Sequence, residues 1–266
     1  MKKVNDRKTG VVLAAGLGSR LAKTWGDGRV KPLVAVDGKV LLLRTLASLE
    51  LACDRVVIVL GFGADSIRSY VENRYHGPMN LVFAVNHLYQ LSNGLSVLAA
   101  REYVGECFVL CMADHIMGDE LLMLARDYVP PAGGAALLVD YKLKTIFDMD
   151  DATKVRAENG KILRIGKNLT DYNCIDTGLF ICSKVLIEVL SEVYQKKGDA
   201  SLSDGIQKLC ERSTMHAIDI GDGFWQDVDT AEMLRHAERQ LILRRSGHAI
   251  LQRACPDREV DSGLVF

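Results

Sequence analysis

Continuous apolar runs of strand length alternate with segments of helical periodicity over the first half of the chain. The strand-like runs are residues 10–15, 55–60, 81–85, 107–112 and 135–140. Apolar positions at helical spacing mark residues 41–51, 65–73, 95–103 and 119–128. Continuous apolar strands separated by helices predict a parallel sheet that is covered on both faces. Ligand-binding loops are then expected at the carboxyl ends of the strands.

The pattern changes after residue 140. Residues 153–157 and 162–167 flank Asn159 and Gly160, a pair that predicts a tight β-hairpin. Further strands are predicted at residues 173–182, 215–220 and 223–228, and helices at residues 184–195, 201–212 and 230–245. Thr230 is the expected cap of the last helix. We therefore expect one domain over residues 1–245, with halves at about 10–140 and 141–245, and a tail or linker at 246–266.

Composition and charge place the chain among ordinary globular proteins. Of its 266 residues, 48% are hydrophobic and 25% are charged, which suits one substantial core. The net charge of −1 argues against a nucleic-acid-binding surface. No apolar run is long enough for a transmembrane segment or a signal peptide, so a cytoplasmic location is expected. The seven cysteines are scattered without metal-site spacing, and we expect them to be reduced and mostly buried.

The first strand ends in a glycine-containing bend that two cations follow. Gly16 and Gly18 lack a Cβ, so the backbone N–H groups there can approach an anion closely. Arg20 and Lys31 add positive charge, which favours a triphosphate as that anion. A dinucleotide-binding fingerprint requires glycine where Leu21 stands, and a Walker-type loop is absent. For the glycines alone, an ordinary strand-to-helix turn is an equal alternative.

The stretch from Leu13 to Leu21, together with Lys31-Pro32-Leu33, resembles the signature of the sugar-nucleotidyltransferase family. Members of this family join a nucleoside triphosphate to a phosphorylated sugar or alcohol and release pyrophosphate. The resemblance extends to about residue 245. It implies an α/β fold, a Rossmann-like three-layer sandwich with a mostly parallel mixed central sheet, here with a small β-hairpin insertion. It also makes Arg20 and Lys31 catalytic, and assigns nucleotide binding to Ala15, Gly16, Leu17, Gly18 and Ser19.

The resemblance further implies a magnesium ion held by two aspartates. One follows the fourth strand, where Asp114 stands, and the other lies near the carboxyl end of the domain. For the second position we favour Asp229, with Asp227 as its rival. The alternative for each carboxylate is a helix cap or a solvated loop charge. That alternative is weakest for Asp114, because an acid that follows a buried strand needs a partner.

Two further loops are candidates for contacts with the nucleotide base. Gly61 follows the second strand, where the backbone could pass under a base. Ser92, Asn93 and Gly94 open the helix before the fourth strand, where a polar side chain could bond a pyrimidine edge. Asn86 is a further candidate of this kind. A plain turn and a helix N-cap explain these residues equally well.

The second half of the chain is expected to bind the acceptor. Lys167 matches a family position that meets a phosphate and is assigned a catalytic role. Lys142, Asp176 and Gly178 are assigned to acceptor binding. Isolated lysines are usually solvated, which is the alternative for Lys142. His115 could line the site beside Asp114, although a phosphate nucleophile that is already ionised needs no general base.

Residues 151–155, 166–180 and 224–230 resemble cytidylyltransferases that activate inositol-1-phosphate or phosphocholine, and the inositol-1-phosphate type more closely. The expected reaction is magnesium-dependent transfer from CTP to that acceptor, which yields a CDP-alcohol, a phospholipid precursor, and pyrophosphate. Members of this type are often fused to a membrane phosphatidyltransferase, so the chain either stands alone or is the soluble portion of such a fusion. Alternatives are a phosphocholine cytidylyltransferase, a hexose-1-phosphate uridylyl- or guanylyltransferase, a non-catalytic nucleotide-binding module and a dinucleotide-dependent oxidoreductase. The oligomeric state stays open.

Overall fold

The computed structural model describes residues 8–18, 20, 21 and 30–254, with side chains as far as Ser246. Within this part of the chain, nine strands form one sheet in the order β5-β4-β1-β6-β11-β8-β12-β10-β9. Their bounds are β1 Lys8–Ala14, β4 Cys53–Leu60, β5 Asn80–Val85, β6 Cys107–Met112, β8 Ala135–Asp140, β9 Lys154–Glu158, β10 Lys161–Gly166, β11 Cys174–Ser183 and β12 Met215–Asp219. Pairing is parallel from β5 to β6, whereas β11 runs antiparallel to both β6 and β8 and joins the two halves. The mixed central sheet confirms the expected fold class.

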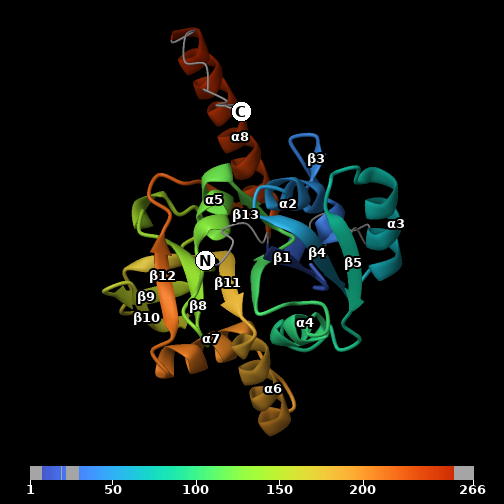
Figure 1. The fold of residues 1–266 in the computed structure, drawn as a ribbon. Coiled ribbons are helices and arrows are strands. Elements are labelled where there is room, and N and C mark those ends of the chain that lie inside the picture. Colours follow the sequence, from blue (N-terminus) through green and yellow to red (C-terminus); the bar gives the residue numbers. More distant parts are fainter. Residues whose placement is uncertain (1–7, 19, 22–29, 255–266) are drawn as a thin grey trace, which may run out of the picture.

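Helices cover both faces of the sheet and complete three layers (Figure 1). One face carries α2 (Leu41–Leu49), α3 (Ala64–Arg74) and α5 (Asp119–Asp127), and the other carries α4 (Gly94–Ala99), α6 (Val185–Lys197) and α7 (Leu202–Glu211). Each face has its own buried apolar cluster. Successive residues of β1 point to opposite faces, so Val11 belongs to one cluster and Val12 to the other. This double burial explains why the strands are continuously apolar.

Short elements at the edge of the sheet position the loops of the site. The strand β7 (His115–Met117) pairs antiparallel with β13 (Trp225–Asp227), and this pairing sets Asp227 opposite His115. A second small hairpin joins β2 (Ala35–Val36) to β3 (Lys39–Val40). Two 3-10 turns, η1 (Lys31–Leu33) and η2 (Leu143–Thr145), lie in the loops after β1 and after β8.

Three sequence predictions are refined by the structure. The predicted hairpin turns at Asn159 and Gly160, whose φ angles of 50° and 74° are those of the favoured tight turn. The helix predicted at 95–103 is α4, which ends at Ala99 and continues as turns. The last helix, α8 (Ala231–Ala254), is capped as expected, because Thr230 Oγ1 accepts from Met233 N at 3.2 Å. It continues nine residues beyond the predicted end and projects from the body (Figure 1).

The cysteines and the helices of the described part of the chain bear on two expectations from composition. Five of the six described cysteines are buried, as expected. Within these residues, no helix combines the length and the apolar character that a membrane span requires.

Candidate active site

The loops that follow β1 and β6 meet at one edge of the sheet because these strands are parallel neighbours. Leu13 pairs with Met112, and Ala113 N donates to Leu13 O at 3.1 Å. In the first loop Gly18 has a φ of 59°, and a Cβ there would lie 2.6 Å from Lys31 Cβ. Gly18 therefore permits both the turn and the close approach of Lys31.

Lys31 lies between two of the predicted aspartates. Its side chain is only 8% exposed, and its Nζ lies 2.5 Å from Asp114 Oδ2 and forms a second ion pair with Asp229 Oδ1. Burial alone would lower the pKa of Lys31, but the two carboxylates outweigh it and raise that pKa. Lys31 is thus a fixed cation that brings Asp114 and Asp229 together.

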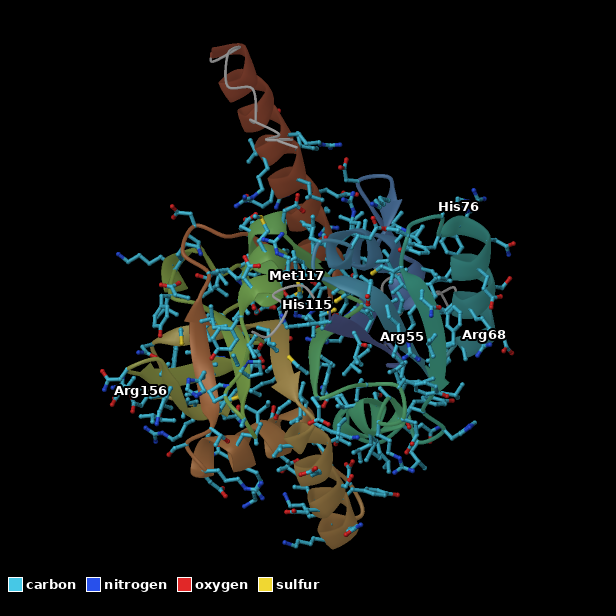
Figure 2. All side chains as sticks on the ribbon, viewed as in Figure 1. Arg55, Arg68, His76, His115, Met117 and Arg156 are labelled. Atoms are coloured by element: carbon cyan, nitrogen blue, oxygen red, sulfur yellow. The ribbon has the colours of Figure 1, made fainter. Side chains whose placement is uncertain are left out.

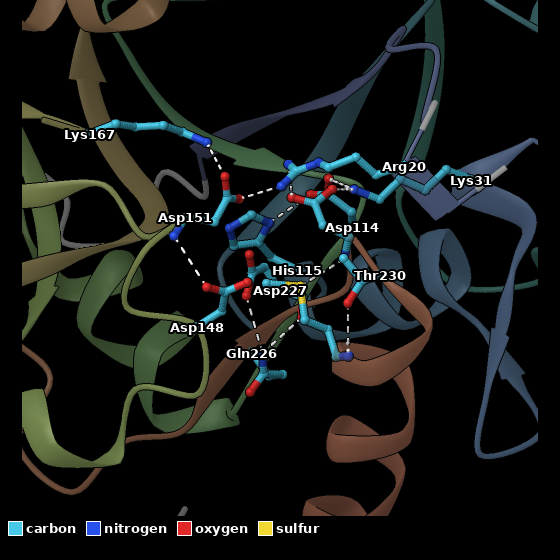
Figure 3. A network of polar contacts seen from close by, with 12 residues as sticks. Arg20, Lys31, Asp114, His115, Asp148, Asp151, Lys167, Gln226, Asp227 and Thr230 are labelled. Carbon is cyan, nitrogen blue, oxygen red and sulfur yellow. Dashed lines mark hydrogen bonds and ion pairs between the residues drawn. The ribbon is translucent and has the colours of Figure 1, made fainter. Parts of the chain in front are cut away.

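Arg20 and Lys167 extend this network across both halves of the domain (Figure 3). Arg20 lies 2.5 Å from Asp229 and, through its other terminal nitrogen, 2.6 Å from Asp151. Lys167 Nζ donates to the second oxygen of Asp151 at 2.7 Å. Although partial burial opposes ionisation of Asp151, the bonds from Lys167 and Arg20 lower its pKa. Arg20, Lys31, Asp114, Asp229 and Lys167 therefore face one site.

Three carboxylates of this site lie close enough together to share a cation. One oxygen each from Asp151, Asp227 and Asp229 lies within 4.8 Å of the others. Burial raises the pKa of Asp227, so its ionised form needs compensating positive charge. Magnesium is bound by one or two carboxylates together with phosphate oxygens and water, and this donor set fits that ion.

His115 connects Asp114 with a neighbouring aromatic ring, Trp225. Its Nδ1 lies 2.7 Å from Asp114 Oδ1, and its ring stacks on Trp225 at a centroid distance of 6.2 Å. Burial alone would lower its pKa, but Asp114 outweighs that effect and raises the pKa of His115 to about 9. The imidazole is therefore protonated at pH 7. Figure 2 shows His115 near the middle of the molecule and the exposed His76 at its edge.

Gly178 is required at its position by this same histidine. It has a φ of 76°, and a Cβ there would lie 2.5 Å from Cδ2 of His115. The Gly178 N–H donates to Asp176 Oδ1 at 2.7 Å. Gly178 thus allows β11 to pass directly against the His115 ring.

Two adjoining cavities open onto the network. The smaller, of about 300 Å³, is lined by Ala15, Gly16, Gly18, Arg20, Lys31 and Asp114 among others. The larger, of about 520 Å³, is lined by residues that include Lys142, Lys167, Asp176, Gly178 and Asp227. Asp229 and Asn93 border both cavities. The residues predicted for the triphosphate and those predicted for the acceptor thus line separate but adjoining spaces.

The predicted base-binding residues also have partners within the fold. Ser92 Oγ donates to Asp199 at 2.7 Å, and Asn93 Oδ1 accepts from Leu202 N at 2.9 Å. A Cβ at Gly94 would lie 2.4 Å from a backbone oxygen, so this glycine permits close packing at the start of α4. These contacts fix the loop before α4 against the start of α7. A contact of Ser92 or Asn93 with a nucleotide base stays a prediction.

The other loop candidates are placed as follows. A Cβ at Gly61 would lie 2.5 Å from Tyr89 Cβ, which again marks a close backbone approach. Tyr89 itself lines the smaller cavity. Leu17 is 45% exposed, and Ser19 lies outside the described residues. Lys142 is tied to Asp140 at 2.9 Å, at the border of the larger cavity.

Sequence reasoning assigned no role to several residues that the site contains. Asp151 belongs to a stretch that resembles the family but received no predicted role, yet it contacts two of the predicted cations. The sequence feature that could have indicated Asp151 is the acidic run that begins at Asp148, after the fifth predicted strand. Trp225 Nε1 donates to Asp140 Oδ2 at 2.9 Å, which fixes one wall of the larger cavity. Buried Asp140 ends a strand and needs such partners.

A known family model and several named proteins match most of the chain. Residues 10–204 match the model of the MobA-like NTP transferase domain. The chain is 32% identical over 247 residues to the bifunctional IPC transferase and DIPP synthase of Archaeoglobus fulgidus and 34% identical over 249 residues to that of Rubrobacter xylanophilus. These alignments cover 91% and 90% of this chain but 46% and 54% of the relatives, so the chain spans about half their length.

Solved structures share the fold. The inositol-1-phosphate CTP transferase from T. maritima superposes with a TM-score of 0.76 at 26% identity, over 88% of this chain and 97% of that one. A UDP-glucose pyrophosphorylase has a TM-score of 0.74 at 17% identity, over 90% of this chain and 100% of that one, which indicates a common fold alone.

Proposed function

The chain belongs to the MobA-like NTP transferase domain family, and on that premise we propose that it transfers the cytidylyl group of CTP to inositol-1-phosphate. The products are the CDP-alcohol and pyrophosphate. The names of its IPC transferase relatives and of the inositol-1-phosphate CTP transferase from T. maritima support this choice of nucleotide and acceptor. The observation that carries the proposal is the continuous network from Lys31 through Arg20 to Lys167, which borders both cavities.

The reaction is a direct displacement at phosphorus. An oxygen of the acceptor phosphate forms a bond to the α-phosphorus of CTP while the bond to the oxygen bridging the α- and β-phosphorus atoms breaks, and pyrophosphate leaves with that electron pair. No covalent enzyme intermediate is needed, because the acceptor phosphate is itself the nucleophile. The two substrates are both anions, so the protein's main task is to hold them together against repulsion.

The cations of the network supply the charge for this task. Gly16 and Gly18 admit the triphosphate to the smaller cavity, where Arg20 and Lys31 exchange a carboxylate partner for phosphate oxygens. Lys167 is proposed to bind the acceptor phosphate from the other side. In the structure each of these cations already pairs with aspartates. The cations are therefore held in position before phosphate oxygens replace a carboxylate as their partner.

A magnesium ion would be held by Asp114 and Asp229, with Asp227 as the rival of Asp229. Asp227 and Asp229 both belong to the close group of carboxylates that Asp151 completes, and Asp114 and Asp229 both pair with Lys31. When bound, the ion neutralises charge on the phosphates. Asp151 lies within the same cluster and would be released from Arg20 as the nucleotide enters. We also place the reaction in the cytoplasm, which suits a chain whose described cysteines are mostly buried, since thiols stay reduced there.

Pyrophosphate release from the purified protein tests the proposal. CTP, UTP and GTP are each combined with inositol-1-phosphate, phosphocholine, glucose-1-phosphate or mannose-1-phosphate, in the presence of Mg²⁺. We expect turnover with CTP and inositol-1-phosphate above all other pairs. Activity with a hexose-1-phosphate but none with CTP would replace the proposal by a hexose-1-phosphate nucleotidyltransferase. Tight nucleotide binding without turnover on any acceptor would indicate a non-catalytic module.

A further inference from the structure

The helix α8 presents two parallel rows of side chains, each with a spacing of four residues. Ala237 belongs to an apolar cluster around Val36, and Leu241 packs against that cluster. His236, Gln240 and Arg244 form the second row, and all three line the larger cavity. Residues four apart share a helix face, so this row, named here the α8 row, forms one continuous strip of the cavity wall.

Polar contacts fix α8 in this position. Glu238 Oε1 accepts from Asp37 N at 3.2 Å, and Arg245 lies 2.6 Å from the Asp37 carboxylate. Asp37 forms the turn between β2 and β3. The wall of the acceptor cavity is therefore held by the nucleotide-binding half, and α8 lies beyond residues 10–204, which match the family model.

The α8 row covers aromatic rings that border the cavity. His236 stacks on Phe147 with a centroid distance of 4.1 Å, and the Arg244 guanidinium lies 4.2 Å from the centroid of Phe224. A quaternary ammonium group is recognised by the open faces of such rings. Here one face of each ring is occupied, and the permanent charge of Arg244 repels a second cation.

The groups that remain available suit hydroxyl groups. The Gln240 side chain is partly buried and makes no hydrogen bond to any residue that the structure describes. Its amide offers both donors and an acceptor, and Arg244 offers N–H donors around its planar group. Burial lowers the pKa of His236, so its imidazole is neutral at pH 7 and can donate or accept.

We propose that the α8 row determines acceptor specificity by binding the hydroxyl groups of a phosphorylated polyol and by excluding phosphorylated quaternary-ammonium alcohols. This inference rests on the proposed function for its assignment of the larger cavity to the acceptor. Gln240 contributes the adaptable amide, and Arg244 contributes both a donor and the repulsive charge. The phosphate end of the acceptor then lies toward Lys167, which lines the same cavity.

Equilibrium binding tests the inference without requiring turnover. Inositol-1-phosphate and phosphocholine are each titrated calorimetrically into the wild type and into Gln240→Ala, Arg244→Ala and the control Arg235→Ala. Arg235 is an exposed arginine of α8 that does not line the cavity. We expect the Kd for inositol-1-phosphate to rise about tenfold in each α8-row variant, the equivalent of one or two lost hydrogen bonds. It should not change in Arg235→Ala.

Steady-state kinetics separates the α8 row from the nucleotide site. The KM for inositol-1-phosphate should rise in both variants while the KM for CTP stays within twofold of the wild-type value. The inference is overturned if the variants bind inositol-1-phosphate like the wild type, or if the wild type binds phosphocholine more tightly or binds neither compound. Binding of inositol-1-phosphate without pyrophosphate release would instead refute the proposed function and leave the role of the α8 row intact.

Discussion

The guanidinium of Arg20 lies 2.6 Å from the carboxylate of Asp151, although the two residues belong to opposite halves of the domain. Asp151 also accepts from Lys167, so one carboxylate holds a cation from each side of the cleft. The pair thus ties the loop after β1 to the second half of the chain, where Lys167 follows β10. In the proposed reaction the two substrate sites then share charge, and a change at Asp151 should affect both of them.

Replacing Asp151 by Asn should lower turnover without unfolding the protein. The amide keeps the size of the side chain but removes the charge that orients Arg20 and Lys167, and it weakens the carboxylate cluster. We expect kcat to fall by about 10- to 100-fold, which is the size of effect that misplaced charged groups have on an enzymatic rate. We also expect the Mg²⁺ concentration for half-maximal rate to rise. Pyrophosphate release measured over a magnesium titration checks both effects.

Asp171→Asn is the matched control for this variant. Asp171 is an aspartate of the same half, it is 57% exposed, and it pairs with Arg164 at 2.6 Å away from the cavities. Its kinetics should equal those of the wild type. Equal magnesium curves for Asp151→Asn and Asp171→Asn would remove Asp151 from the site.

Arg20 and Lys31 should respond differently to removal because their burial differs. Arg20 is 47% exposed, so Arg20→Ala should cost less than about 1 kcal/mol of unfolding free energy. Lys31→Met leaves two partly buried carboxylates facing each other and should cost about 2–3 kcal/mol. Both changes should lower turnover at least about 100-fold, since both charges act on the phosphates. Denaturant unfolding together with pyrophosphate release checks this, and equal stability losses would contradict it.

The strand pattern was predictable because the sheet is buried on both faces. Residues 107–112 and 135–139 are apolar at every position, and the structure places β6 at 107–112 and β8 at 135–140. The pairing of β7 with β13 was not predictable. Each strand has three residues, too few for a period, and their contact depends on how distant segments pack.

The site was predictable as far as local motifs reach. Gly18, Arg20 and Asp114 follow strand ends, and parallel neighbours bring such ends together. Asp151 could not be assigned, because its loop reaches Arg20 only through the folding of the second half. The spacing of the α8 row is visible in the sequence, but nothing there indicates which face of the helix borders a cavity.

Gly178→Ala should destabilise the protein more than Gly160→Ala does. Both glycines have a φ near 74–76°, so each substitution carries a similar backbone cost of about 1 kcal/mol. A Cβ at Gly160 meets nothing within 4 Å, whereas one at Gly178 lies 2.5 Å from His115. We expect a further loss of about 1–3 kcal/mol at Gly178, measured by denaturant unfolding. Equal losses at both positions would show that the His115 ring moves aside freely.

Asp176→Asn should stabilise the protein increasingly as pH rises. Burial raises the pKa of Asp176 to about 6, above its ordinary value of 3.8, although the N–H of Gly178 and the charge of His115 oppose the shift. Between these two values the folded protein binds more protons than the unfolded chain, so wild-type stability falls as pH rises through this window and the loss is complete above about pH 6. Asn carries no charge, and its Oδ1 can still accept from Gly178 N. Urea unfolding should therefore show nearly equal stabilities of the two proteins at pH 4. At pH 7 the variant should be about 1–2 kcal/mol more stable. This difference is smaller than the free energy that corresponds to the full pKa shift, because the Asp176 side chain keeps some exposure. A pH-independent difference between the two proteins would show that Asp176 stays ionised in the folded state.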